Sequence, residues 1–137
     1  MAKLPRPGVT WLALAVLTFT CLQVLRAWRA FAQADFINSL PLPVPALYYQ
    51  ISGIIWALAG LALLIGLLGR QRWFQQALPI VTGVYLVTEW FDRLALGRQA
   101  QHTNTVFMIG VSLVLFGAAW FIRELPGVRD HFGEMYE

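Results

Sequence analysis

The chain has 137 residues, of which 58% are hydrophobic and 12% are charged. Soluble domains carry about 25% charged residues, so this composition excludes an ordinary soluble domain and indicates a single membrane-embedded one. The net charge of +3 comes from scattered basic residues, which excludes a nucleic-acid-binding stripe and fits anionic lipid headgroups.

Four apolar runs follow one another along the chain, at 9–25, 46–68, 77–91 and 105–122. A helix needs roughly 20 apolar residues to cross a bilayer core of about 30 Å. The second and fourth runs approach this length, whereas the first and third need flanking residues to span. We therefore predict an all-α integral membrane four-helix bundle that forms a single domain over 1–137. Its helices are predicted at about 9–31, 46–68, 73–96 and 105–123, followed by a short polar tail at 124–137.

Aromatic residues mark the ends of these predicted helices. Trp and Tyr favour the membrane interface, because their rings are apolar and carry one polar tip. Tyr48 and Tyr49 stand at the start of the second predicted helix. The tryptophans near predicted ends are Trp11, Trp28, Trp73, Trp90 and Trp120.

The distribution of Lys and Arg predicts the orientation. With four spans, both termini share a side with the loop that joins the second and third helices. That side holds Lys3, Arg6, Arg70, Arg72, Arg123 and Arg129. The opposite side holds Arg26, Arg29, Arg93 and Arg98. Since cytoplasmic loops are richer in basic residues, we predict a multi-pass protein of the cell inner membrane with both termini in the cytoplasm.

Charged residues gather where the first and third predicted helices reach the same side of the membrane. They are Arg26, Arg29, Glu89, Asp92 and Arg93. Charges neutralise one another more cheaply than they stand alone in a low-dielectric environment. We interpret the group as an ionic cluster in which Arg26 or Arg29 pairs with Glu89 or Asp92, with Tyr85 one turn away as a hydrogen-bond donor. The alternative is a proton or ion relay, which normally places an acid deeper in the membrane.

Small residues form faces on two of the predicted helices. The second helix carries Gly53, Ala57 and Gly60 on one face and Gly66 on another, and the fourth carries Gly110 and Gly117. In lipid, such faces let helices approach closely and gain van der Waals contact. They predict packing within the bundle or, alternatively, docking to a neighbouring subunit.

Histidines and cysteines offer no pattern typical of a cofactor or metal site. His102 and His131 lie in a predicted loop and in the predicted tail, whereas axial ligands to a haem in the membrane normally come from helices. We expect both to be solvated surface residues. The spacing of Asp130, His131 and Glu134 is nonspecific for a metal. We therefore expect no cofactor, no metal and no catalytic residue.

Several segments resemble a group of small, uncharacterised four-span bacterial membrane proteins. They are RPGVTWLALAVLTF from Arg6, ISGIIWALAGLALLIGLL from Ile51, EWFDRL from Glu89 and HFGEMYE from His131. The similarity covers most of the chain. It implies a four-span fold and carries no activity.

These features predict a non-enzymatic function. The main expectation is a cofactor-free accessory or scaffolding subunit of a larger membrane complex, with other integral membrane subunits and membrane lipids as partners and no nucleic acid. The small size, the small-residue faces and the short polar segments favour it. The alternative is a stand-alone protein that handles a quinone, a proton or a small solute, which would need a polar path or an apolar cleft with a few polar groups.

Overall fold

The computed structural model describes residues 7–41, 44–96 and 104–133, and every regular element in these ranges is helical. The elements are α1 (Pro7–Ala32), α2 (Ala34–Ser39), α3 (Ala46–Leu68), α4 (Trp73–Phe91), the π-helical segment η1 (Asp92–Leu96), α5 (Thr105–Ile122) and α6 (Pro126–Gly133). The third predicted helix is thus α4 together with η1.

Among the described helices, three are long and apolar enough to cross a membrane: those over Gly8–Ala32, Ala46–Leu68 and Thr105–Ile122. The sequence had predicted four such helices. The difference is α4, which has polar residues along its whole length. They are Gln75, Gln76, Thr82, Tyr85, Thr88 and Glu89.

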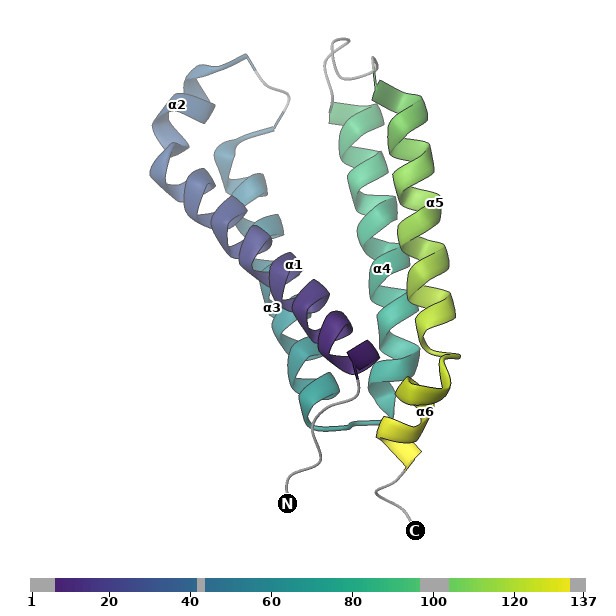
Figure 1. Ribbon diagram of the computed structural model, residues 1–137. Helices are drawn as coiled ribbons and strands as arrows, with labels where there is room; N and C mark the ends of the chain where they lie inside the picture. The colour runs from purple at the N-terminus through teal and green to yellow at the C-terminus, as the bar shows by residue number, and fades with distance from the viewer. Residues whose placement is uncertain (1–6, 42–43, 97–103, 134–137) are drawn as a thin grey trace.

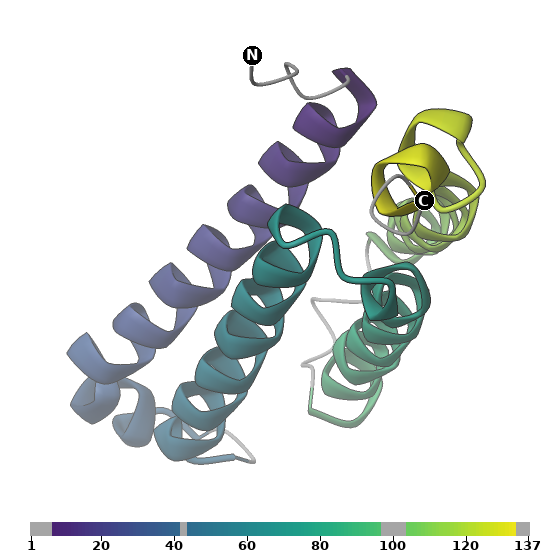
Figure 2. The ribbon, with the colours of Figure 1, turned by 90° about the horizontal axis from the view of Figure 1, so that it is seen from below.

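The long helices form two pairs, α1 with α3 and α4 with α5 (Figure 1). Viewed from the end where α6 lies, α1 and α3 run side by side, and α4 and α5 form the second pair (Figure 2). Within the second pair, Trp90 Nε1 donates a hydrogen bond to Ser112 Oγ over 3.0 Å. A Cβ on Gly83 would lie 3.3 Å from the Phe116 ring, so this glycine lets the two helices approach closely.

The two pairs lie close together near α6 and diverge toward the end where α2 lies (Figure 1). The apolar core fills the narrow end. Its buried residues are Val9, Leu12, Val16, Leu63, Leu67, Phe74, Leu78, Ala119, Val128 and Phe132. Because the pairs diverge, side chains at the other end must bridge a wider space.

The predicted polar tail at 124–137 is wrong for the part that the structure describes. Residues 126–133 form α6, and this helix packs against α1. Val128 and Phe132 are buried in the core, and the Phe132 ring stacks on Phe74 with 5.5 Å between the ring centroids. The sequence did not reveal this role, because most of the segment is polar or charged. Its two buried apolar residues, Val128 and Phe132, are four residues apart and share one face of a short helix.

Candidate functional site

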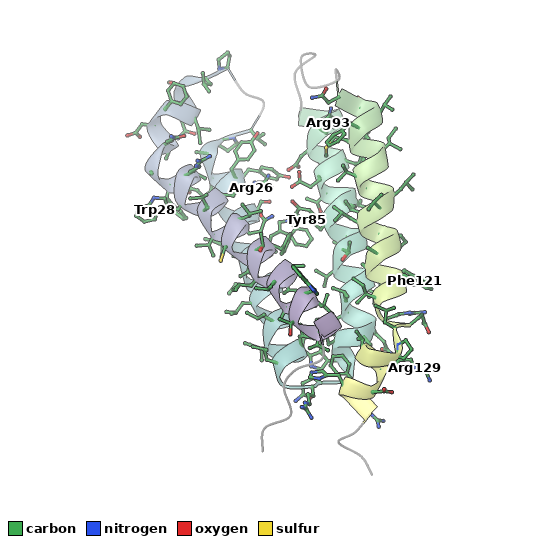
Figure 3. The ribbon with its side chains drawn as sticks, viewed as in Figure 1. Arg26, Trp28, Tyr85, Arg93, Phe121 and Arg129 are labelled. Carbon is green, nitrogen blue, oxygen red and sulfur yellow. The ribbon has the colours of Figure 1, made fainter. Side chains whose placement is uncertain are left out.

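Polar side chains from three helices meet between the diverging pairs. We call this group the polar layer and define it as Gln23, Arg26, Tyr48, Tyr85, Glu89 and Asp92. In Figure 3, Arg26 and Tyr85 lie between the two helix pairs, whereas Trp28 and Phe121 lie on the outer sides of the molecule. Helical spacing explains the meeting, since Gln23 and Arg26 are one turn apart on α1, as are Tyr85 and Glu89 on α4.

Arg26 is the centre of the polar layer. Its Nη1 donates a hydrogen bond to Glu89 Oε1 over 2.6 Å, and its Nη2 lies 3.6 Å from Asp92 Oδ2. The three side chains are 30%, 28% and 14% exposed, in the order Arg26, Glu89, Asp92. One guanidinium therefore joins α1 to two carboxylates on α4 and η1, in a place that is largely screened from solvent.

Two further hydrogen bonds extend the polar layer. Gln23 Nε2 donates to the Tyr85 hydroxyl over 3.2 Å, and the Tyr48 hydroxyl donates to Asp92 Oδ1. Tyr48 brings α3 into contact with η1. Polar contacts thus join α1 to α4 and α3 to η1, at the end of the molecule that lies beyond the apolar core.

An aromatic layer lies one turn below the polar layer, toward the core. The Tyr85 ring makes edge-to-face contacts with Phe19 of α1 and Trp56 of α3, each with 5.0 Å between the ring centroids. Edge-to-face pairs of this kind are worth about 0.5–1.5 kcal/mol beyond the area they bury. Tyr85 therefore contacts α1 and α3 with its ring and the polar layer with its hydroxyl.

A cavity of about 260 Å³ lies beneath the aromatic layer, between the two helix pairs. Its walls come from α1, α3, α4 and α5 and are apolar apart from Thr82 and Tyr85. The Thr82 hydroxyl already donates to the Leu78 carbonyl oxygen over 2.8 Å. Such a cavity suits an apolar occupant, since an apolar cavity of about 150 Å³ already holds benzene.

Three buried polar atoms in or beside the polar layer have no hydrogen-bond partner among the described residues: Gln23 Oε1, Ser52 Oγ and Asp92 Oδ2. Buried polar groups are normally paired, so these atoms are unusual. The Gln23 amide oxygen and the Asp92 carboxylate oxygen accept hydrogen bonds only, and the Asp92 oxygen already lies in an ion pair with Arg26 Nη2 at 3.6 Å. The layer therefore has spare acceptors and could receive a donor such as water or a ligand hydroxyl.

The structure places the five predicted cluster residues differently. Arg26, Glu89 and Asp92 come together, and Arg93 is half-buried in η1 at the same end of the molecule (Figure 3). Arg29 is exposed and joins no ion pair within the described ranges. Arg29 lies three residues beyond Arg26 on α1, so the two side chains are offset by about 60° around the helix axis.

Tyr48 and Gln23 belong to the site, although the prediction of the ionic cluster did not include them. Gln23 stands three residues before Arg26 on α1, and this helical spacing is the sequence signal for it. Tyr48 had no such signal, because a tyrosine in the first turn of an apolar helix fits an interfacial position equally well. Asp92 meets the Tyr48 hydroxyl only because η1 runs beside the start of α3.

The predicted packing glycines divide into two groups. A Cβ on Gly53 would lie 2.9 Å from Ala27, one on Gly60 would lie 2.4 Å from Thr20 Oγ1, and one on Gly66 would lie 2.7 Å from the Trp73 ring. These three pack inside the molecule, and Ala57 is half-buried between them. Gly110 and Gly117 of α5 face open space, with nothing within 4 Å of an added Cβ.

His131 is half-buried on α6, and a ring nitrogen lies 3.2 Å from the Leu67 carbonyl oxygen. The expectation of a solvated His131 is therefore wrong, because α6 docks against the end of α3. His102 lies outside the described residues. In the described ranges, no group of three or more His, Cys, Asp or Glu side chains could hold a metal ion.

No family model matches the sequence, and neither a curated protein nor a solved structure matches it.

Proposed function

We propose that the chain is an integral membrane protein with four spans, α1, α3, α4 and α5, and that it serves as a cofactor-free accessory or scaffolding subunit of a larger assembly in a bacterial inner membrane. Both termini are assigned to the cytoplasm by the Lys and Arg distribution. Its partners are other integral membrane subunits and membrane lipids.

The two faces of α4 support its assignment as the fourth span. Tyr85 and Glu89 point toward α1, while the opposite face carries Ile80, Val84, Val87 and Phe91, which are 54–70% exposed. Polar residues in a span normally face the bundle interior, and apolar ones face lipid. The polar residues that lower the overall hydropathy of α4 are therefore compatible with a span.

The main support for the accessory role is the exposed apolar surface of α5. Only Ala119 of its 18 residues is buried, and α4 is its main neighbour. Its most exposed side chains are Val106, Phe107, Leu113, Val114 and Phe121. Gly110 and Gly117, seven residues apart, form a small-residue face with open space beside it. Helices associate in membranes through such faces, so α5 is the surface for another membrane subunit.

Native-gel migration after extraction in mild detergent tests this role. The wild-type chain should co-migrate with a large assembly, and Gly117→Leu should release it, because the new side chain fills the space that a partner helix needs. Val114→Leu is the matched control, since it enlarges an already bulky exposed residue of the same helix. Gly60→Leu is unsuitable, because Thr20 occupies that space and folding itself would suffer.

A lone small band for the wild type would contradict the accessory role. It would favour the second candidate, a stand-alone protein that handles a quinone or a small amphipathic solute. The cavity beneath Tyr85 and the unpartnered Gln23 Oε1 above it support that candidate. Mass spectrometry of the purified protein would then have to find a bound amphiphile that is lost when Ala118→Trp fills the cavity.

A further inference from the structure

A second pocket lies at the corner where α1, α2 and α3 meet, on a different side of Arg26 from the carboxylates. We call it the corner pocket; its volume is about 330 Å³. The residues that line it are Leu22, Leu25, Arg26, Arg29, Ala30, Gln33, Ile37 and Tyr49. The geometry points to a function that nothing described so far requires: we propose that the corner pocket binds an anionic phospholipid, with the lipid phosphate at Arg29.

The charges of the pocket favour an anion. Arg26 is neutralised by Glu89 and Asp92, whereas Arg29 joins no ion pair within the described ranges. Arg29 therefore supplies the net positive charge of the pocket, and its guanidinium fork matches phosphate oxygens in a bidentate geometry. Gln33 and Tyr49 add neutral hydrogen-bond donors to the lining.

The absence of carboxylates among the lining residues selects the type of headgroup. Zwitterionic lipids also carry a phosphate, but their ammonium group would find no acidic side chain in this pocket. An anionic lipid with a glycerol headgroup has a single negative charge, on its phosphate, which Arg29 complements. Its headgroup hydroxyls can form hydrogen bonds with Gln33. Asp35 of α2 is exposed and does not line the pocket.

The pocket changes from apolar to basic in the direction that a lipid requires. Leu22 and Leu25 are 58% and 46% exposed and lie within the span Gly8–Ala32, so they offer a wall for an acyl chain. Arg29 lies two turns beyond Leu22, about 10 Å further along the helix axis, and near the end of that span. Ile37 of α2 is also part of the lining. Basic pockets between spans bind anionic headgroups in the same arrangement.

The simpler interpretation is that Arg29 only extends to the headgroup region, as interfacial arginines do. Such an arginine would interact with any phosphate surface and would show neither saturation nor selectivity. A pocket that combines an arginine outside the described ion pairs, neutral hydrogen-bond donors and an apolar wall predicts both. This difference makes the proposal testable.

The experiment measures the thermal stability of the purified full chain in detergent during titration with phosphatidylglycerol, with phosphatidylcholine and with inorganic phosphate, and counts bound lipids by native mass spectrometry. Phosphatidylglycerol should raise the melting temperature saturably, with one lipid retained, and the other two should not. Arg29→Gln should weaken this binding by about tenfold, since it removes a charge-assisted contact. Arg29→Lys should weaken it less. Arg129→Gln, which removes the same charge from an exposed position of α6, is the matched control and should bind as the wild type does.

Equal stabilisation by phosphatidylcholine or by inorganic phosphate would overturn the proposal, as would an unchanged phosphatidylglycerol titration for Arg29→Gln. The Arg29 side chain joins no ion pair with another described residue, so Arg29→Gln should fold as the wild type does, and its melting temperature without lipid verifies this. The inference rests on the proposed membrane location. Alkaline extraction of membranes tests that location separately, so the two can fail independently.

Discussion

At the scale of single residues, Arg26 decides how the two helix pairs are held at their diverging ends. A guanidinium that serves two carboxylates is costly to leave alone, because each partner has lost part of its contact with solvent. The Arg26 and Glu89 side chains are nevertheless 30% and 28% exposed, so their ion pair contributes less to stability than a fully buried pair would. The value of this pair lies in fixing the rotation of α1 relative to α4.

A double-mutant cycle on Arg26→Leu and Glu89→Leu measures this coupling. Each single substitution should destabilise the protein by about 1–3 kcal/mol, and the double variant should lose less than the sum, because it removes Arg26 and Glu89 together and Asp92 keeps its hydrogen bond from Tyr48. Thermal unfolding in detergent gives the free energies. The matched control is the cycle on Arg29→Leu and Glu89→Leu, which should be additive within about 0.5 kcal/mol. Additivity in both cycles would show that Arg26 and Glu89 do not interact.

At the scale of elements, α6 is the piece that closes the narrow end of the molecule. It contributes Phe132 and Val128 to the core and covers the end of α3 through His131. A short helix of eight residues has little stability of its own, so it forms because its apolar face finds this site. The glycines of α3 act at the same scale, since Gly53 lets α1 and α3 approach to a distance that a Cβ would prevent.

Two phenylalanine substitutions test the role of α6. Phe132→Ala should cost about 3–5 kcal/mol of stability, because the ring is 2% exposed and stacks on Phe74. Phe121→Ala removes the same ring from a position that is 67% exposed, and it should cost about 0.5 kcal/mol or less. Comparison of their melting temperatures in detergent provides the measurement. Similar losses for the two variants would mean that α6 is not docked as described.

At the scale of the whole molecule, topology follows from which helices cross the membrane. The described helix α2 and the end of α4 lie at the diverging end, whereas the α3–α4 connection and α6 lie at the narrow end (Figure 1). If all four long helices span, these ends are the two membrane sides. If α4 lies outside the bilayer, the segment after α4 falls on the other side.

Cysteine labelling with an impermeant reagent on intact cells distinguishes these cases. The exposed native Cys21 is first replaced by alanine, and this variant is the unlabelled control. Ser39→Cys and Asn104→Cys should be labelled from outside, and Gln71→Cys should react only after lysis. The reverse pattern would invert the orientation. Labelling of Asn104→Cys together with Gln71→Cys, and not with Ser39→Cys, would exclude α4 as a span.

The helical class and the positions of the long helices could be predicted from the sequence, because apolar length and interfacial aromatic residues are local properties of the chain. The chance of an ion pair between α1 and α4 was also visible, since Arg26 and Glu89 stand at equal depth on neighbouring helices. The sequence did not show which side chains form the pairs. Arg26 rather than Arg29 faces Glu89, and Tyr48 reaches Asp92, because the rotation of each helix depends on contacts with all its neighbours.

The sequence by itself determined that this protein is helical and rich in segments that leave water, because composition and apolar length need no knowledge of neighbours. Only the tertiary structure decided the rest. It buries Phe132 in a segment that looks polar, turns Gly53 inward and Gly117 outward, and leaves Arg29 outside the ion pairs of Arg26, in a pocket that both arginines line. These outcomes depend on packing between residues that are far apart in the chain. The type of a residue does not determine which distant residue its side chain contacts.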